Sequence, residues 1–272
     1  MIPMKWRVSI REAFLAVRWI VCIFEVEFNP AIMKKTFALL SLVMMLALSG
    51  CSQLAGDPTS KTFSLKYYTK INVDGAFHVT VSNAANQVIV VAGEKVLSKV
   101  VVEVVDETLK IYLKGFEVGS WLSDLEVVVP YNASMSDVAL SGAARFQSDF
   151  PISSRKVGIS LSGASKCYCE VEAKELSVDL SGASEAALKG KSTSIAAHLS
   201  SASSISDRKD ENRYALSCNT FTGTISSAST AHIHCDGTIK ADLSGASKLH
   251  YSGKATTKGS STSGNSHIIH HD

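Results

Sequence analysis

The sequence lacks the short motifs that mark common catalytic and nucleotide-binding sites. It has no nucleophile elbow and no phosphate-binding loop. No two neighbouring predicted strands bring together the pair of carboxylates that cleavage of a polysaccharide ordinarily needs. It also lacks a basic patch. Residues 1–50 hold six of the 27 basic and three of the 25 acidic residues, so residues 51–272 hold 21 basic and 22 acidic residues and are close to neutral. We therefore predict that the protein is not an enzyme and has no nucleic-acid partner.

The apolar run at 37–48 is too short to span a membrane, and its surroundings predict a targeting signal over 33–50. Met33-Lys34-Lys35 precede the run, and Leu48-Ser49-Gly50-Cys51 end it. A basic start, a short apolar segment and small residues before a cysteine are typical of a secretory signal. The last four residues resemble the lipobox of bacterial lipoproteins, which implies that Cys51 is lipidated and becomes the N-terminus.

Residues 1–32 have no place in a lipoprotein that begins at Met33. We interpret them as a spurious upstream extension, and their own apolar stretch, 14–24, leaves an N-terminal anchor as the alternative. Residues 51–61 are polar and contain Gly56 and Pro58, so they are predicted to be a tether. This organisation predicts an outer-membrane lipoprotein of the cell envelope that faces either the periplasm or the cell surface.

A short phrase, Leu-Ser-Gly-Ala-Ser with its variants, recurs through the second half of the sequence. Its starts are separated by 21, 19, 19, 26, 18 and 19 residues. A near-constant period of this length indicates one structural unit that is stacked on itself. The copies begin at Leu140, Leu161, Leu180, Leu199, Ile225, Leu243 and, in a weaker form, Thr262.

Each repeat is predicted to contain two short strands joined by a tight corner. Small or apolar residues alternate with polar ones on both sides of the repeated leucine, and Ser, Gly and Ala suit the corner between them. No repeat has the helical segment or the asparagine ladder of a leucine-rich repeat. The sequence therefore predicts an all-β fold in which 131–272 is a β-helix-like solenoid of about 19-residue coils.

Two columns of serine are expected to lie one above another along this solenoid, where they suit the tight corners and could form ladders of hydroxyl groups. The longest step between repeats contains the charged segment 207–213, which is predicted to be a loop that bulges from one coil. Such loops often carry a binding face, although a solvated loop is the plainer interpretation. The two columns are Ser162, Ser181, Ser200, Ser226, Ser244 and Ser165, Ser184, Ser203, Ser229, Ser247.

Residues 62–130 are predicted to be a small strand-rich region that caps the open end of the solenoid. Asp74-Gly75 is a typical hairpin turn, and Asp106-Glu107 joins two further strands, 100–105 and 109–113. No helical pattern interrupts these strands. A cap would cover the unpaired edge that the first coil otherwise exposes.

Four cysteines lie in the repeats. Cys167 and Cys169 alternate in one predicted strand and both face inward, where they behave as small apolar side chains. Cys218 and Cys235 are able to form a disulfide in an oxidising compartment, and the sequence leaves this pairing open.

The two halves together resemble the putative autotransporter adhesin, head GIN domain family, a Bacteroidetes-type lipoprotein family of unknown function. The resemblance rests on Val-Asp-Gly-Ala-Phe-His-Val at 73–79, on Leu-Lys-Ile-Tyr-Leu at 109–113 and above all on the repeated phrase, and it covers roughly 67–268. It implies a β-helical fold and a cell-envelope location. It brings no catalytic residues with it.

Two groups of outward-facing polar residues are the candidate sites. Asp179 and His198 stand directly before the repeated leucine in successive repeats and are expected to lie side by side, as a surface contact rather than a catalytic pair. His232, His234 and His250 are weak candidates for a zinc site, because imidazoles about 5 Å apart could share the ion. No acidic or thiolate ligand completes that set, so we predict no metal and no cofactor.

The predicted function is binding. Flat stacked strands would present repeated Ser, Thr, Asn and Lys side chains to a polysaccharide or another envelope protein in weak, multivalent contacts, while the lipid anchors the chain to the membrane. The alternatives are a polysaccharide-degrading β-helix enzyme of the pectinase or lyase type and a purely structural periplasmic protein.

Overall fold

The structure, a computed structural model, describes residues 58–115, 125–206 and 215–272. The segments with period-two alternation form β-strands. All of the described residues belong to one unit, Ser52–Asp272, and the prediction of an all-β fold is confirmed. One short helix, α4 (Glu94–Leu97), stands where the sequence predicted no helix. The expected extension 1–32, signal 33–50, lipidated Cys51 and loop 207–213 lie outside the described residues.

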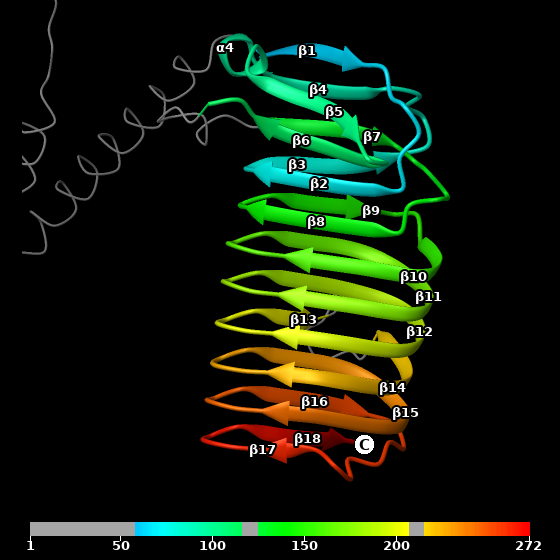
Figure 1. Cartoon of the computed structure of the whole chain (residues 1–272), viewed down its shortest axis with the longest axis vertical. Helices are drawn as coiled ribbons and strands as arrows, with labels where there is room; N and C mark the ends of the chain where they lie inside the picture. Colours follow the sequence, from blue (N-terminus) through cyan, green and yellow to red (C-terminus); the bar gives the residue numbers. More distant parts are fainter. Residues whose placement is uncertain (1–57, 116–124, 207–214) are drawn as a thin grey trace, which may run out of the picture. The chain divides into compact units, whose positions relative to one another are not determined.

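The strands lie in layers along the long axis of Figure 1 and share one sheet. Among the described residues, no helix is long and apolar enough to cross a membrane. The strands are β1 (Pro58–Phe63), β2 (Lys70–Gly75), β3 (Phe77–Ser82), β4 (Val88–Gly93), β5 (Val100–Val105), β6 (Thr108–Leu113), β7 (Leu125–Pro130), β8 (Asp137–Gly142), β9 (Arg145–Ser148), β10 (Ile152–Leu161), β11 (Lys166–Leu180), β12 (Glu185–Leu199), β13 (Ser204–Ser206), β14 (Leu216–Ile225), β15 (Thr230–Leu243), β16 (Lys248–Ser252), β17 (Ser261–Thr262) and β18 (His267–His271). In this sheet β2 and β3 lie between β8 and β9 on one side and β4 to β7 on the other.

Neighbouring layers pair in parallel with an offset of one sequence repeat. Ile159 pairs with Val178, and Val178 pairs with Ala197 one layer further on. The repeated leucines pair with one another in the same way and face the apolar core, where each is at most 3% exposed. The sequence period is therefore the spacing of the layers. The paired leucine positions are Leu140, Leu161, Leu180, Leu199, Ile225 and Leu243.

The corner of each layer is held by a backbone hydrogen bond from the following layer. Ala183 N donates to Gly163 O at 2.7 Å, and the same bond recurs at the equivalent corners. A Cβ on Gly182 would lie 2.4 Å from Gly163 O, and Gly182 has a φ of +74°, so both the spacing and the conformation favour glycine. Ser201 and Ser227 occupy the equivalent corners with φ of +69° and +63°.

The predicted hairpin at Asp74-Gly75 is wrong, because β2 pairs with β6 and β8 whereas β3 pairs with β7 and β9, all in parallel. Gly75 has a φ of +122° and accepts a hydrogen bond from Ala143 N at 2.9 Å. Val73 is the register partner of Leu140. Residues 73–76 are thus a degenerate first copy of the repeated phrase, and an Asp-Gly turn serves a corner between strands as well as a hairpin.

The remaining N-terminal strands pair antiparallel. β5 and β6 form the predicted hairpin, in which Asp106 and Glu107 have φ of +49° and +57°. β1 pairs with β4, and β4 pairs with β7. Residues 58–61, expected to belong to the tether, form the first part of β1, since their backbone groups complete the edge of β4.

Buried serines line the corners, and within the described residues they do not form a continuous ladder of hydroxyl groups. Ser165 Oγ donates to Ser162 O at 2.9 Å, and Ser247 Oγ donates to Ile225 O at 2.9 Å. Ser203 and Ser229 alone in this column share a hydroxyl–hydroxyl bond in the described chain, at 3.4 Å. At Ser165 and Ser247 a backbone carbonyl lies within hydrogen-bond distance of the hydroxyl, whereas the strands of neighbouring layers are about 4.8 Å apart.

Candidate functional site

One line of outward-facing side chains runs across the layers and forms what we call the outer row. Each member except Ser261 stands directly before a buried residue of the leucine column, so alternation along the strand turns its side chain to solvent. Ser261, the last member, stands before Thr262, which is exposed. Successive members are register partners on adjacent strands, which places them in a continuous line. The outer row is Asn72, Ala139, Ser160, Asp179, His198, Thr224, Asp242 and Ser261.

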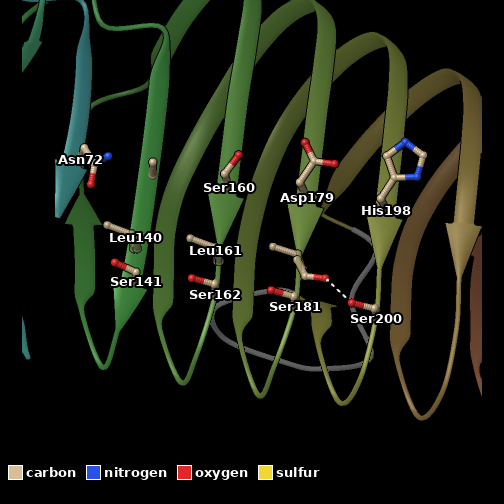
Figure 2. Close-up of a pocket in the computed structure, with 12 residues that line it drawn as sticks. Asn72, Leu140, Ser141, Ser160, Leu161, Ser162, Asp179, Ser181, His198 and Ser200 are labelled. Carbon is tan, nitrogen blue, oxygen red and sulfur yellow. Dashed lines mark hydrogen bonds between the residues drawn. The ribbon is translucent and has the colours of Figure 1, made fainter. Parts of the chain in front are cut away.

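An open groove of about 440 Å³ lies over the first five members of the outer row. Figure 2 shows Asn72, Ser160, Asp179 and His198 on the same face, on β2, β10, β11 and β12. The other side of the groove is a row of corner hydroxyl groups that follow the buried leucines. Its lining therefore combines amide, hydroxyl, carboxylate and imidazole groups over an apolar base. The corner hydroxyls belong to Ser141, Ser162, Ser181 and Ser200.

Asp179 and His198 are register neighbours, as predicted, but no hydrogen bond joins them in the described part of the chain. Asp179 Oδ2 accepts from Ser177 Oγ at 3.3 Å, and His198 Nδ1 lies 3.0 Å from Thr224 Oγ1. Further along the outer row, Ser261 Oγ donates to Asp242 Oδ1 at 2.6 Å. The imidazole is thus engaged with the layer on the far side from the carboxylate, and the two groups do not form an acid–base pair.

The three candidate metal ligands do not converge on one point. His232 and His250 are register partners whose rings stack 4.6 Å apart at an interplanar angle of 16°, so their faces meet rather than their nitrogens. His250 Nδ1 lies 2.9 Å from His271 Nε2. Burial first, then the charges of His232, His271 and Lys248, lower the pKa of His250 to about 4. In the part of the chain that the structure describes, no three His, Cys, Asp or Glu side chains are arranged to hold a metal ion.

His234, the third candidate, is the centre of a hydrogen-bonded chain that the sequence did not indicate. Its Nδ1 lies 2.9 Å from Ser252 Oγ, and its Nε2 lies 3.2 Å from Asp236 Oδ2. Lys254 N donates to Asp236, and this bond, followed by that of His234, lowers the pKa of the Asp236 carboxyl. The order Asp236, His234, Ser252 resembles that of a hydrolase triad, but in a triad Nε2 of the histidine faces the serine, whereas here Nδ1 does. These residues also lie outside the groove of the outer row. The hydrogen-bonded chain links β15 to β16.

Sequence reasoning also missed Asn72 as a member of the site. Asn72 pairs with Ala139 through the β2–β8 ladder, although 67 residues separate them in the sequence. The signal that could have found it is the degenerate corner at 73–76, aligned on the repeated phrase.

Comparison with known proteins gives a family and a fold. The chain matches the model of the putative auto-transporter adhesin, head GIN domain family over residues 67–255. No curated protein matches the chain. Similar solved structures include a putative adhesin from Bacteroides fragilis, with a TM-score of 0.66 at 16% identity over 79% of this chain and 97% of the other.

Two structures from Parabacteroides distasonis are also similar. A putative adhesin has a TM-score of 0.61 at 18% identity over 79% of this chain and 97% of the other. A putative lipid binding protein has a TM-score of 0.59 at 15% identity over 80% and 98%. At these identities the likeness concerns the fold alone. Because the family match spans well over half of the sequence, this protein belongs to the putative auto-transporter adhesin, head GIN domain family.

Proposed function

We propose that this protein is a lipid-anchored binding module of the cell envelope that holds polysaccharide along its outer row. The observation that carries the proposal is the groove over Asn72, Ser160, Asp179 and His198, which register pairing places in one line. The adhesin-like family to which the chain belongs supports a surface or envelope location. The Leu-Ser-Gly-Cys pattern that ends at Cys51 supports the lipid anchor.

The spacing of the groups favours a polymer as ligand. Parallel layers repeat about every 4.8 Å, so donors and acceptors recur at regular intervals along the outer row. A polymer with repeated hydroxyl groups can contact several layers at once, whereas a compact molecule contacts few. Each exposed contact is weak, and linked contacts raise the overall affinity without any single strong one. The carboxylate of Asp179 is the strongest acceptor in the groove, because charged hydrogen bonds exceed neutral ones.

The architecture that would carry this row is a β-helix-like solenoid over 131–272, capped by the strand-rich region 62–130. Parallel pairing at an offset of one repeat supports the solenoid. The antiparallel pairs β1–β4 and β4–β7 support the cap, because they extend the sheet beyond the first parallel layers. A rigid scaffold of this kind keeps the outer row straight.

The test is binding of the full chain to a panel of bacterial and host polysaccharides immobilised on a biosensor. We expect micromolar to millimolar binding to at least one of them. We expect Asp179→Asn to weaken it about 5- to 10-fold, because the amide oxygen still accepts a hydrogen bond but lacks the charge that strengthens it by roughly 1 kcal/mol. Asp106→Asn is the matched control, because it removes the same charge from the exposed β5–β6 turn, outside the groove. Absence of binding to every polysaccharide, or equal effects of the two variants, would refute the assignment.

A polysaccharide-degrading enzyme is the alternative that would use the same groove. Glycoside hydrolysis ordinarily needs two carboxyl groups on either side of the bond, and Asp179 is the acidic residue among those that line the groove. The enzyme alternative predicts that new reducing ends appear on incubation with the bound polysaccharide, and that Asp179→Asn and His198→Ala abolish them. A purely structural role predicts neither binding nor cleavage.

Location is tested separately, by protease treatment of intact cells and detection with an antibody against residues 62–272. Loss of the protein from intact cells would place the outer row outside and support adhesion. Protection until the outer membrane is broken would place it in the periplasm and refute surface adhesion. Cys51→Ala should release the chain from the membrane fraction if this cysteine carries the lipid.

A further inference from the structure

Cys218 on β14 and Cys235 on β15 lie side by side on adjacent parallel strands. They are register partners, they are buried at 7% and 0% exposure, and both are free thiols in this structure. Adjacent strands lie about 4.8 Å apart, which falls inside the range of about 4.4–6.8 Å between Cα atoms that disulfides span. The ladder shifts register directly after Cys218, between it and Thr220, so the backbone at this pair departs from the regular sheet.

Cys167 and Cys169 provide a contrast within the same molecule. Their sulfur atoms lie 3.8 Å apart, and both thiols are buried. They are two positions apart in one strand, however, so their Cα atoms are separated by about 6.6 Å, near the upper limit for a disulfide. The spacing between adjacent strands is therefore closer to the usual Cα separation of a disulfide than the spacing along one strand is, and this favours Cys218–Cys235 over Cys167–Cys169.

We propose that Cys218 and Cys235 are an oxidation site at which an external disulfide converts the two thiols into one intramolecular disulfide that ties β14 to β15. The proposal does not depend on polysaccharide binding. The bond would close the 18-residue segment 218–235. This segment begins inside the longest step between repeats, where the register of β14 against β15 shifts after Cys218.

The chemistry is thiol–disulfide exchange, and Cys235 is the attacking group. A hydrogen bond with the Cys218 thiol lowers the pKa of Cys235 to about 7, and the same bond, with burial, raises the pKa of Cys218. The Cys235 thiolate attacks one sulfur of glutathione disulfide, and the first glutathione leaves as a thiolate. Cys218 then loses its proton and attacks the Cys235 sulfur, which releases the second glutathione. Two protein thiols are oxidised, one glutathione disulfide is reduced to two thiols, and the two protons pass from the cysteines to glutathione.

Burial of both thiols limits access of the disulfide in the folded chain. Exchange should therefore be slow in the native protein and fast while the chain refolds. Once formed, the bond should raise the melting temperature, because closing a loop of this length restricts the unfolded chain. We expect an increase on the order of 5–10 °C.

The experiment uses the full chain, reduced and unfolded, then refolded with or without a mixture of oxidised and reduced glutathione. After thiols are blocked with iodoacetamide, trypsin releases peptide 214–240, which contains Cys218 and Cys235, and peptide 167–174, which contains Cys167 and Cys169. We expect 214–240 to be recovered unalkylated and lighter by two hydrogens only after oxidation. Peptide 167–174 should be doubly alkylated in both samples.

Two variants complete the test. Cys235→Ala should leave Cys218 alkylated and should lose the rise in melting temperature, whereas Cys167→Ala should keep it. Alkylation of both thiols in 214–240 after oxidative refolding would overturn the proposal, and so would equal oxidation of the two peptides. If Cys235→Ala does not fold, the peptide masses of the unmutated chain still decide between these outcomes.

Discussion

Two buried serines at equivalent corners give the sharpest test of how the stack is stabilised. Ser184 and Ser247 occupy the same column of the repeat and are 1% and 0% exposed. Ser247 Oγ donates to Ile225 O at 2.9 Å. Ser184 Oγ is buried and has no hydrogen-bond partner within the described residues. The same substitution, serine to alanine, should therefore have opposite effects at the two positions.

The magnitudes follow from the hydrogen bonds. Ser247→Ala removes one buried bond but leaves Ile225 O with the bond from Ser244 N at 3.0 Å, so the free energy of unfolding should fall by about 1 kcal/mol. Ser184→Ala removes a buried hydroxyl whose desolvation nothing offsets, so it should raise the free energy of unfolding by roughly 1 kcal/mol. Changes in chain entropy and apolar area are the same at both sites and cancel in the comparison.

The assay is equilibrium unfolding of the full chain in guanidinium chloride and by heat, followed with two probes to check that the transition is cooperative. The two variants should differ by about 2 kcal/mol, or about 4–8 °C in melting temperature for a chain of this size. Ser165→Ala is the control and should resemble Ser247→Ala, because Ser165 Oγ also bonds a carbonyl at 2.9 Å. Equal destabilisation at Ser184 and Ser247 would refute the reasoning.

Three further predictions concern stability. His250 has a pKa lowered to about 4 by burial and by His232, His271 and Lys248, so the unfolded chain takes up a proton that the native chain does not as pH falls from about 6.5 to 4. Native stability should decline across that window by less than about 2 kcal/mol, because the ring is partly solvated, and melting curves of His250→Gln should show a smaller decline. Tyr68→Phe should lower the free energy of unfolding by about 1 kcal/mol, since it removes the 2.9 Å bond from the Tyr68 hydroxyl to Pro130 O. Burial raises the pKa of Tyr68 to about 12. The stability that this group contributes should therefore be lost between pH 10 and 12 in the unmutated chain and not in the variant. Gly190→Ala should cost more than about 2 kcal/mol, because Gly190 has a φ of +109° and its Cβ would lie 2.2 Å from Val171 O. Gly259→Ala, with a φ of +95° and nothing within 4 Å, should cost about 1 kcal/mol from conformation alone, and equal losses in denaturant unfolding would contradict the steric argument.

The sequence period predicted the strand register because packing leaves little freedom at the repeated positions. A leucine column that faces the core and a glycine that approaches the preceding backbone can recur only at the layer spacing. Alternation on either side of Leu161 or Leu180 then decides which side chains face solvent. For this reason Asp179 and His198 are neighbours in the structure, as their equivalent positions in successive repeats predicted.

The first corner, at residues 73–76, was not predicted because it departs from the repeated phrase and from its constant period. Val73 and Asp74 stand where later copies have leucine and serine, and strands β4 to β7 intervene before Leu140. A search for a constant period cannot bridge such an insertion. The hydrogen-bond partners of side chains could not be predicted from the repeat either. His198 can turn to either neighbouring layer, and its contact with Thr224 depends on local rotamers rather than on the repeat spacing.

Constraint and freedom are divided along each repeat, and this division locates both proposals. The corner keeps Ser, Gly and Ala because close backbone contact permits little else, whereas the outer row changes from layer to layer, from Ser160 to Asp179 to His198. Variation on a fixed scaffold is what selective binding requires, so the ligand preference is expected in the outer row. Conversely, Ser201 and Ser227 replace glycine at corners with positive φ, and each such residue costs about 1 kcal/mol or more. These two strained corners lie on either side of the 26-residue step, and a covalent bond between β14 and β15 would stabilise the layers where the repeat is weakest.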